Sequence, residues 1–300
     1  MTEGKSVYVF PGQGRDITER DIALLDCSPH ETQMADDILG YSSKELVCGT
    51  ASQVVKETVY AQPLIFLLNH LAYLHDATDT RFSYFIGHSL GEFNGLVAAG
   101  CLSFEDGLRI VKQRAELMSV ACAEHHGGMS AVIGKNYQEI MDAIAQASPG
   151  GGISIANLNS PRQLVVSGLI NDIAQFQDAI PKDKIRTVSL KVGGAFHSKY
   201  MSSANAAFAP YIDDNTFCST DAFGKVISCV TARPYGDDAA ETLRAHMVSQ
   251  VNFIGAVEYA IEHDSYAFSI ARSDSSFQRF VDDIKFDLII RHQRRDSPWD

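Results

Sequence analysis

Hydrophobic and polar residues follow two different periods in this chain, and each change of period marks an element. Residues 82–86 are nearly all apolar, and three of the five are aromatic, as in a short buried strand. Leu90, Phe93, Leu96 and Val97 then fall on one face of a helix, with glycines and alanines opposite. The pattern therefore predicts a strand followed by a helix that can pack closely against a sheet.

The junction of this strand and helix reads Gly-x-Ser-x-Gly, from Gly87 through Ser89 to Gly91. Such a turn is typical of a nucleophile elbow, in which glycines two residues either side of the serine avoid steric clashes. A simpler interpretation is a capping box, with Ser89 as the helix cap and Glu92 reaching back to its backbone. The five residues alone leave both interpretations open.

The same periods predict alternating strands and helices along the rest of the chain. Further strands are expected at 7–10, 129–133, 153–158, 164–166, 188–192, 226–230 and 266–270. Short helices are expected within 20–55. A longer helix is expected from Gln62-Pro63 onward, with Pro63 in its first turn, and another after an N-cap at Ser103. Further helices are expected at 137–147, 170–180, 202–212, 240–250 and 254–261 and at the C-terminus.

Between residues 125 and 195 the predicted order is β-α-β-β-α-β, which is a ferredoxin-like unit. We expect this unit to be a small subdomain inserted into a larger one. Residues 1–124 and 196–300 would then form a large α/β-hydrolase-like subdomain with a parallel sheet and the elbow.

Composition narrows the possible functions. A net charge of -12 argues against nucleic acid as the main partner, because phosphate binding requires a basic face. The six cysteines are scattered without a C-x-x-C pair, so free thiols in a reducing cytoplasm are expected and a metal site is not. The longest apolar run, residues 63–68, is too short to span a bilayer. We expect a cytoplasmic protein without a membrane segment.

Three polar residues elsewhere are candidates for chemistry around Ser89. Gln13 follows the first strand in a Pro-Gly-Gln-Gly loop, which is either a plain turn or a source of oxyanion donors. His197 follows two glycines and comes after the serine in chain order, as the base does in elbow enzymes. Arg114 lies in a predicted helix, where most arginines are solvated. His88 points the wrong way for a base, so a structural role is expected.

Taken together, these motifs resemble the malonyl-CoA:acyl-carrier-protein transacylase family over residues 7 to about 262. The matching segments are Phe10-Pro11-Gly12-Gln13-Gly14, Gln62-Pro63, Gly87-His88-Ser89-Leu90-Gly91-Glu92, Arg114, Asn157-x-Asn159-Ser160-Pro161 and Ala195-Phe196-His197-Ser198. The chain looks most like the free-standing acyltransferases that serve modular polyketide synthases in trans.

The resemblance implies a role for each matching residue. Ser89 would carry the acyl group as an ester, and His197 would be its general base. Arg114 would pair with the free carboxylate of a malonyl-type group. The remaining implied positions are Gln13 and the Leu90 N–H as the oxyanion hole, Gln62, Asn157 and Phe196 at the substrate, and a backbone carbonyl near Gln250 that orients the histidine.

The implied reaction moves a malonyl group from malonyl-CoA to the phosphopantetheine thiol of an acyl carrier protein. That thiol belongs to the partner, so no resident cofactor is expected. Phe196 resembles the bulky residue that malonyl-selective members have before the histidine, and the resemblance thus implies little room for an α-methyl group and favours malonyl over methylmalonyl. The first alternative is a hydrolase that clears stalled acyl groups from carrier proteins. The second alternative is an inactive docking subunit of a synthase. Such hydrolases tend to lack the arginine, so Arg114 favours the transferase.

Two segments depart from the family pattern. Arg15-Asp16 stands where the family commonly has Ser-Gln. The glycine-rich turn that the family has near residue 270 is replaced by residues 269–277, which contain no glycine. A tight turn there would have to form without glycine.

Overall fold

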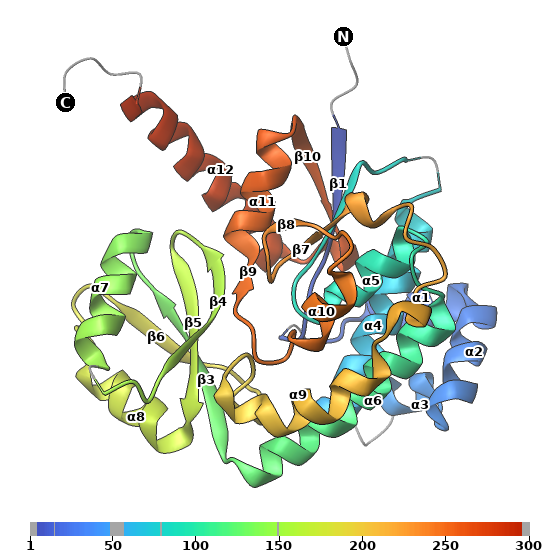
Figure 1. The fold of residues 1–300 in the computed structure, drawn as a ribbon, viewed down its shortest axis with the longest axis horizontal. Coiled ribbons are helices and arrows are strands. Elements are labelled where there is room, and N and C mark those ends of the chain that lie inside the picture. The colour runs from blue at the N-terminus through green and yellow to red at the C-terminus, as the bar shows by residue number, and fades with distance from the viewer. Residues whose placement is uncertain (1–4, 15, 49–56, 79, 149, 296–300) are drawn as a thin grey trace.

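The computed structural model describes residues 5–14, 16–48, 57–78, 80–148 and 150–295, and Figure 1 shows their fold as two sheets surrounded by helices. The first sheet has the order β10-β1-β2-β7-β8. Its strands are β1 (Lys5–Phe10), β2 (Tyr84–Gly87), β7 (Val226–Ser228), β8 (Arg233–Pro234) and β10 (Ser265–Ile270). Only β8 is antiparallel to its neighbour, so the predicted parallel sheet is confirmed.

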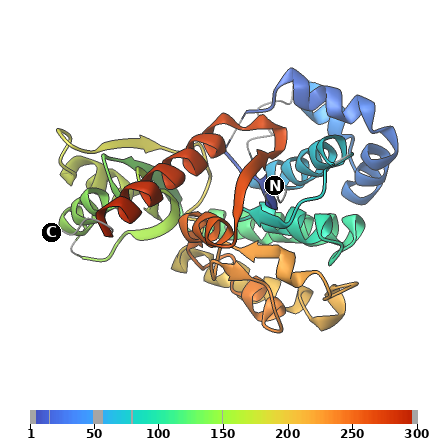
Figure 2. The same ribbon diagram turned by 90° about the horizontal axis from the view of Figure 1, so that it is seen from above.

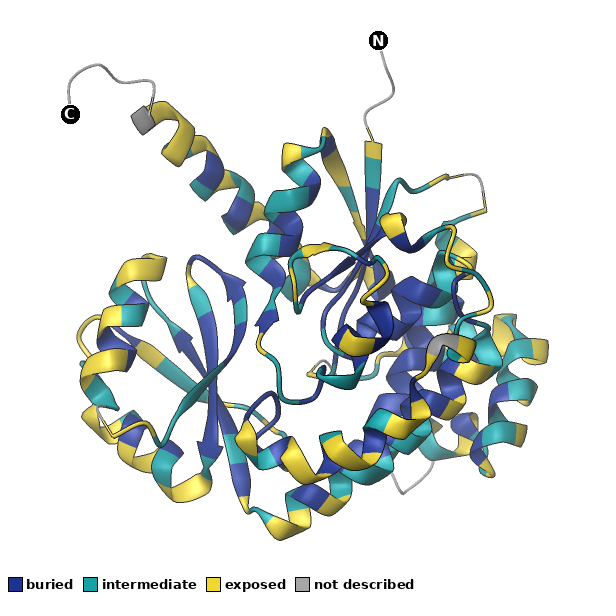
Figure 3. Ribbon diagram, in the orientation of Figure 1, coloured by how far each residue is buried: buried dark blue, intermediate teal, exposed yellow. Residues whose placement is uncertain are grey.

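Helices cover both faces of this sheet, and alternate residues of β1 point to each face. Tyr8 and Phe10 pack into the cluster that contains α4 and α6 side chains, whereas Val7 and Val9 pack toward α11 and α12. Figure 3 shows the inner strands β1, β2 and β7 as mostly buried, whereas β10 at the edge is largely exposed. The helices are α1 (Glu19–Cys27), α2 (Pro29–Leu39), α3 (Ser43–Cys48), α4 (Thr58–Asp76), α5 (Gly91–Ala98), α6 (Phe104–Glu124), α9 (Ser202–Phe208), α10 (Ala239–Arg244), α11 (Phe253–Glu262) and α12 (Ser275–Arg295).

The second sheet has the order β6-β3-β5-β4-β9 and forms the smaller lobe seen in Figures 1 and 2. Its elements are β3 (Gly127–Ile133), α7 (Tyr137–Ala147), β4 (Ser154–Ser160), β5 (Gln163–Leu169), α8 (Ile170–Ala179), β6 (Arg186–Ser189) and β9 (Val251–Asn252). The predicted β-α-β-β-α-β order and ferredoxin-like fold are thus confirmed. The added strand β9 comes from much later in the chain, and the boundaries at 125 and 195 stay a prediction.

Several limits differ from those expected. The α-helix expected over 202–212 ends at Phe208, and the strand expected over 188–192 is Arg186–Ser189. The helix predicted to begin at Gln62-Pro63 begins at Thr58, which places Pro63 beyond its first turn. Burial of the following leucines outweighs the backbone hydrogen bond that a proline nitrogen cannot donate. The helix expected over 240–250 ends at Arg244, because the chain turns there toward β9. None of the helices in the described ranges combines the length and apolar character that a bilayer crossing requires.

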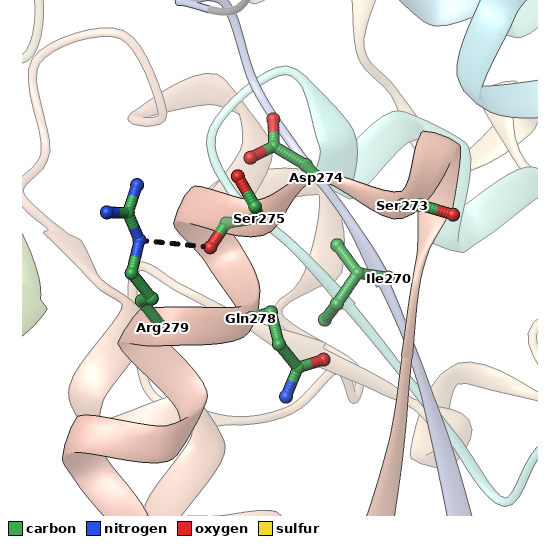
Figure 4. A pocket seen from close by; sticks show the side chains of 6 residues that line it. All are labelled: Ile270, Ser273, Asp274, Ser275, Gln278 and Arg279. Carbon is green, nitrogen blue, oxygen red and sulfur yellow. Dashed lines mark hydrogen bonds between the residues drawn. The ribbon is translucent and has the colours of Figure 1, made fainter. Parts of the chain in front are cut away.

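The doubtful segment 269–277 forms a tight turn without glycine. β10 leads through a single 3-10 turn into α12, and Arg272 and Ser273 have φ of 58° and 50°. These values lie in the left-handed region, which side chains other than glycine rarely adopt. Asp274 stabilises the helix start by accepting from the Ser276 N–H at 2.8 Å. Figure 4 shows Ser273, Asp274 and Ser275 along this turn and start of the helix.

A buried ion pair holds this turn against α1. Arg272 donates through Nε and Nη2 to the two carboxylate oxygens of Asp21, at 2.7 and 3.0 Å, and both side chains are 1% exposed. Burial alone would raise the pKa of Asp21, but the hydrogen bonds and charge of Arg272, with hydrogen bonds from Thr18, lower it to about 2. The pair offsets the backbone strain that glycine would have avoided. The other departure, Arg15, lies outside the described residues.

We expect Asp21→Asn to lower the free energy of unfolding by about 3–5 kcal/mol at pH 7, because it leaves the buried Arg272 charge without its carboxylate. The stability from ionised Asp21 is fully present above about pH 4 and is lost as pH falls through 2, since its folded pKa is depressed. Urea unfolding measures both. Glu19→Gln on the same helix is the matched control, and equal stability of the two variants would contradict the assignment.

Candidate active site

The turn at Ser89 has the backbone of a nucleophile elbow. Ser89 has φ of 51°, at the junction where β2 ends and α5 begins. A Cβ on Gly87 would lie 2.1 Å from the Glu92 nitrogen, and one on Gly91 would lie 2.1 Å from the Phe10 carbonyl oxygen. Both positions therefore require glycine. The capping-box interpretation is wrong, because the Glu92 carboxylate instead accepts from the Cys229 N–H at 3.0 Å.

Ser89 and His197 form a hydrogen-bonded pair. Their Oγ and Nε2 atoms are 2.8 Å apart, and His197 Nδ1 is 2.9 Å from the Ser249 carbonyl oxygen. A carbonyl can only accept, so Nδ1 carries the proton and Nε2 is free to accept from the serine. The orienting carbonyl was expected near Gln250, and it is one residue earlier. Gln250 itself donates from Nε2 to the Ile155 carbonyl at 2.9 Å, because β9 pairs with β4 there.

The surroundings keep His197 neutral. Burial lowers its pKa well below 6.5, and the nearby His246, Arg114 and His88 lower it further, while the bond to Ser249 acts in the opposite direction. A neutral imidazole beside a hydroxyl can remove its proton. The pair can therefore act as nucleophile and base at neutral pH.

Arg114 extends from α6 to the same serine. Its side chain is 1% exposed, and Nη2 donates to Ser89 Oγ at 3.2 Å while Nη1 donates to Gln62 Oε1. Burial lowers the pKa of Arg114 to about 10, against the opposing attraction of Glu92, so the group stays cationic at neutral pH. Among the described residues no carboxylate forms an ion pair with it, and its Nε has no hydrogen-bond partner. This buried cation is a ready partner for an anionic ligand.

A small cavity of about 60 Å³ lies beside the serine. It is lined by Gln13, Gln62, His88, Ser89, Leu90, Arg114, Met118, Met129, Asn157, Leu190, Val192, Phe196 and His197. Every predicted site residue except Gln250 lines it, and their catalytic and binding roles stay predictions. Gln62 is oriented by a contact from Nε2 to the Met118 sulfur at 3.3 Å, and the buried Asn157 Oδ1 has no partner within the described structure.

The loop that carries Gln13 is held against the elbow by buried contacts. Asn69 donates from Nδ2 to the Pro11 carbonyl at 2.8 Å, and the His88 N–H donates to the Phe10 carbonyl at 2.9 Å. A Cβ on Gly12 would lie 2.8 Å from the His88 carbonyl oxygen, so the two loops approach as closely as their backbones allow. Gln13 lines the same cavity as Leu90 at the start of α5, where free N–H groups favour negative charge.

His88 links the elbow to the second sheet rather than serving as a base. Its Nε2 is 2.9 Å from Asn159 Oδ1 on β4, and its ring packs edge-on against Phe277. Burial lowers its pKa, which keeps the imidazole neutral. The expected structural role agrees with these contacts.

Sequence reasoning missed two buried polar residues behind Arg114. His246 Nδ1 is 3.5 Å from Arg114 Nη2, and His246 Nε2 is 3.2 Å from Glu92 Oε1. Glu92 stands in the quoted motif, but its spacing from Ser89 suggested a cap. His246 is one of ten histidines in a segment expected to be helical, so no local pattern marked it.

The chain is similar in sequence and in fold to known proteins. A family model described as the acyl transferase domain matches residues 7–271. The polyketide biosynthesis malonyl CoA-acyl carrier protein transacylase BaeC of Bacillus velezensis is 36% identical over 266 residues, covering 87% of this chain and 90% of that protein. A crystal structure of a malonyl CoA-acyl carrier protein transacylase from Burkholderia pseudomallei has a TM-score of 0.84 at 33% identity, covering 99% of this chain and 100% of that one.

Some relatives are much longer. The polyketide biosynthesis protein ThaF of Burkholderia thailandensis is 36% identical over 275 residues, which is 90% of this chain but 23% of that protein. The chain thus spans about a quarter of that relative's length.

Acylation of Ser89 by p-nitrophenyl acetate should keep its rate as pH falls to about 6.5, where an ordinary histidine becomes half protonated, because the pKa of His197 lies well below that value. The pre-steady-state burst of p-nitrophenol, followed from pH 5 to 8, gives the profile. In Arg114→Gln the acid limb should move to higher pH, because a cation that disfavours the imidazolium is removed. If the acid limb of the pH–rate profile were the same in the wild type and in Arg114→Gln, this electrostatic account would be contradicted.

Proposed function

Because this chain belongs to the acyl transferase domain family, we propose that it transfers a malonyl group from malonyl-CoA, through an ester on Ser89, to the thiol of an acyl carrier protein. One observation supports malonyl as the acyl group. The buried Arg114 donates to Ser89 Oγ at 3.2 Å and lacks a carboxylate partner among the described residues. An acyl group that ends in a carboxylate supplies that partner at the correct place. Guanidinium suits it because its donors match both carboxylate oxygens.

The dyad supplies the chemistry in two half-reactions. Ser89 attacks the thioester carbonyl while its proton passes to His197 Nε2, and the departing coenzyme A thiolate takes that proton. The carrier-protein thiol then attacks the serine ester, and His197 accepts the thiol proton and returns it to Ser89. The Ser249 carbonyl stabilises the protonated imidazole in place of a carboxylate. Backbone donors at Leu90 and the Gln13 loop would stabilise the developing oxyanion.

The lining of the cavity favours a small acyl head. Phe196 lines the cavity together with His197, and its ring occupies space that an α-methyl branch would need, which supports malonyl over methylmalonyl. Gln62 and Asn157 offer polar contacts to the carboxylate end. The reaction needs no resident cofactor, because the phosphopantetheine that accepts the acyl group belongs to the partner.

The biological setting follows from the relatives. Proteins named for polyketide biosynthesis are 36% identical to this chain, which supports loading of extender units onto the carrier domains of a polyketide synthase. A free-standing enzyme acting in trans on such carriers, in the cytoplasm, is the form we propose. The negative charge of -12 requires that an acidic carrier protein dock on a local basic surface.

Hydrolysis of stalled acyl groups is the competing activity on this scaffold. It needs the same dyad but has no use for a cation beside the serine, so Arg114 at 3.2 Å favours transfer. An inactive docking subunit does not require a nucleophile and a base, so the Ser89–His197 contact of 2.8 Å favours an active enzyme. Both alternatives can be excluded by direct measurement.

Incubation with malonyl-CoA should give an enzyme heavier by one malonyl group in intact mass spectrometry, and Ser89→Ala should give none. Addition of a holo carrier protein should then discharge the adduct onto that protein. Rapid hydrolysis of acetyl-carrier thioesters without any malonyl adduct would favour the hydrolase. Absence of both activities in folded protein would favour the docking subunit.

Arg114→Ala should reduce malonyl loading by at least about 30-fold, since losing a buried hydrogen-bonded charge pair costs about 2–5 kcal/mol. Acetyl loading should be unchanged or higher, because acetyl has no carboxylate to lose. Arg109→Ala is the matched control, since Arg109 lies on the same helix with an exposed side chain. Unaffected malonyl loading in Arg114→Ala would refute the carboxylate anchor.

A further inference from the structure

Behind the candidate site, an imidazole separates a buried cation from a buried carboxylate. His246 follows α10 in the turn that leads to β9, and its side chain is fully buried. Nε2 is 3.2 Å from Glu92 Oε1, and Nδ1 is 3.5 Å from Arg114 Nη2. Because arginine only donates, Nδ1 is the accepting nitrogen, and Nε2–H donates to Glu92. With Nδ1 accepting and Nε2–H donating, the imidazole connects the two charged groups.

The carboxylate side of this bridge is rigid. Glu92 is fully buried and also accepts from the Cys229 N–H at 3.0 Å and from the Tyr235 hydroxyl. Acceptance from three donors is the pattern of an ionised carboxylate. Burial and this neighbouring negative charge raise the pKa of Tyr235 well above its usual value, so the hydroxyl remains a donor. Glu92 therefore cannot follow Arg114 if the guanidinium moves.

The cation side of the bridge faces the acyl group. Arg114 Nη2 has Ser89 Oγ at 3.2 Å and His246 Nδ1 at 3.5 Å, while Nη1 contacts Gln62. The neighbouring Glu92 attracts the guanidinium charge without a direct ion pair between them. Direct pairing would occupy the guanidinium donors that a ligand carboxylate needs. With the imidazole between them, Glu92 offsets part of the cost of burying the cation and leaves those donors available.

We propose that His246 is a positioning residue that determines acyl selectivity, by holding the Arg114 guanidinium in its ligand-binding orientation and keeping Glu92 from pairing with it. The inference rests on the proposed function, because it assumes that Arg114 binds the malonyl carboxylate. An acyl group without a carboxylate does not use this arrangement. Loss of His246 should therefore affect malonyl and acetyl groups differently.

The test compares second-order rates of Ser89 loading from malonyl-CoA and acetyl-CoA by intact mass spectrometry. In His246→Leu the malonyl-to-acetyl ratio should fall at least tenfold, because leucine neither accepts from Arg114 nor separates the charges by hydrogen bonding. In His246→Gln the ratio should recover in part, since an amide can accept from Arg114 through oxygen and donate to Glu92 through nitrogen. A loss of packing alone would slow both acyl groups together.

Tyr235→Phe is the matched control, because it removes another hydrogen bond to Glu92 without touching Arg114. It should lower thermal stability and leave the ratio unchanged. If His246→Leu does not fold, His246→Asn gives the same comparison, since its short amide cannot contact both partners. An unchanged ratio in folded His246→Leu, or in His246→Asn where the leucine variant does not fold, overturns this inference alone. Wild-type protein that accepts no malonyl group overturns the proposed function as well.

Discussion

Close approach of α5 to the first sheet is the constraint on which the site depends. Gly91 lies so near the Phe10 carbonyl that a Cβ there would approach to 2.1 Å, and Gly87 is equally restricted by the Glu92 nitrogen. With that contact, Ser89 adopts a left-handed backbone conformation, and its hydroxyl contacts His197 and Arg114. It also brings the end of β1, and hence the Gln13 loop, against the helix N-terminus. The hydroxyl, its base and the backbone donors can meet only because two glycines permit this packing.

The charge beside Ser89 distinguishes this elbow from that of an enzyme whose substrate is a neutral ester. The cavity is lined by one cation, Arg114, and by two imidazoles, His88 and His197, whose pKa values are lowered by burial. His246 and Glu92 lie behind Arg114. The positive charge of Arg114 lowers the pKa of His197 and so keeps the imidazole able to accept a proton. The same charge is available to bind a negatively charged ligand. Arg114 therefore acts both in anion recognition and on the pKa of His197. A substitution there removes the anion partner and moves the pH at which the base becomes protonated.

The sequence predicted the elements that have a strong local period. The strands, the helices and the β-α-β-β-α-β order follow from apolar spacing. The glycines at Ser89 left an elbow and a capping box open, and the resemblance of the motifs favoured the elbow and singled out Arg114, which lies in a helix where most arginines are solvated. What it could not predict depends on contacts between distant residues. The Glu92–His246 contact joins positions 154 residues apart, and the Arg272–Asp21 pair joins positions 251 apart. The carbonyl beside His197 was misplaced by one residue because β9 pairs with β4 through two residues only, too short a strand for a pattern to reveal.

Strand β9 has a further consequence for how the two lobes can evolve or be engineered. It belongs in sequence to the large lobe, yet it is hydrogen-bonded to β4 of the small lobe, and the carbonyl that orients His197 lies two residues before its first residue. The small lobe is therefore not a transplantable module. A chimera that exchanges only residues 125–195 would join a foreign β4 to the native β9 and shift the histidine's acceptor, so recombination between relatives has to exchange the 249–252 segment together with the insertion.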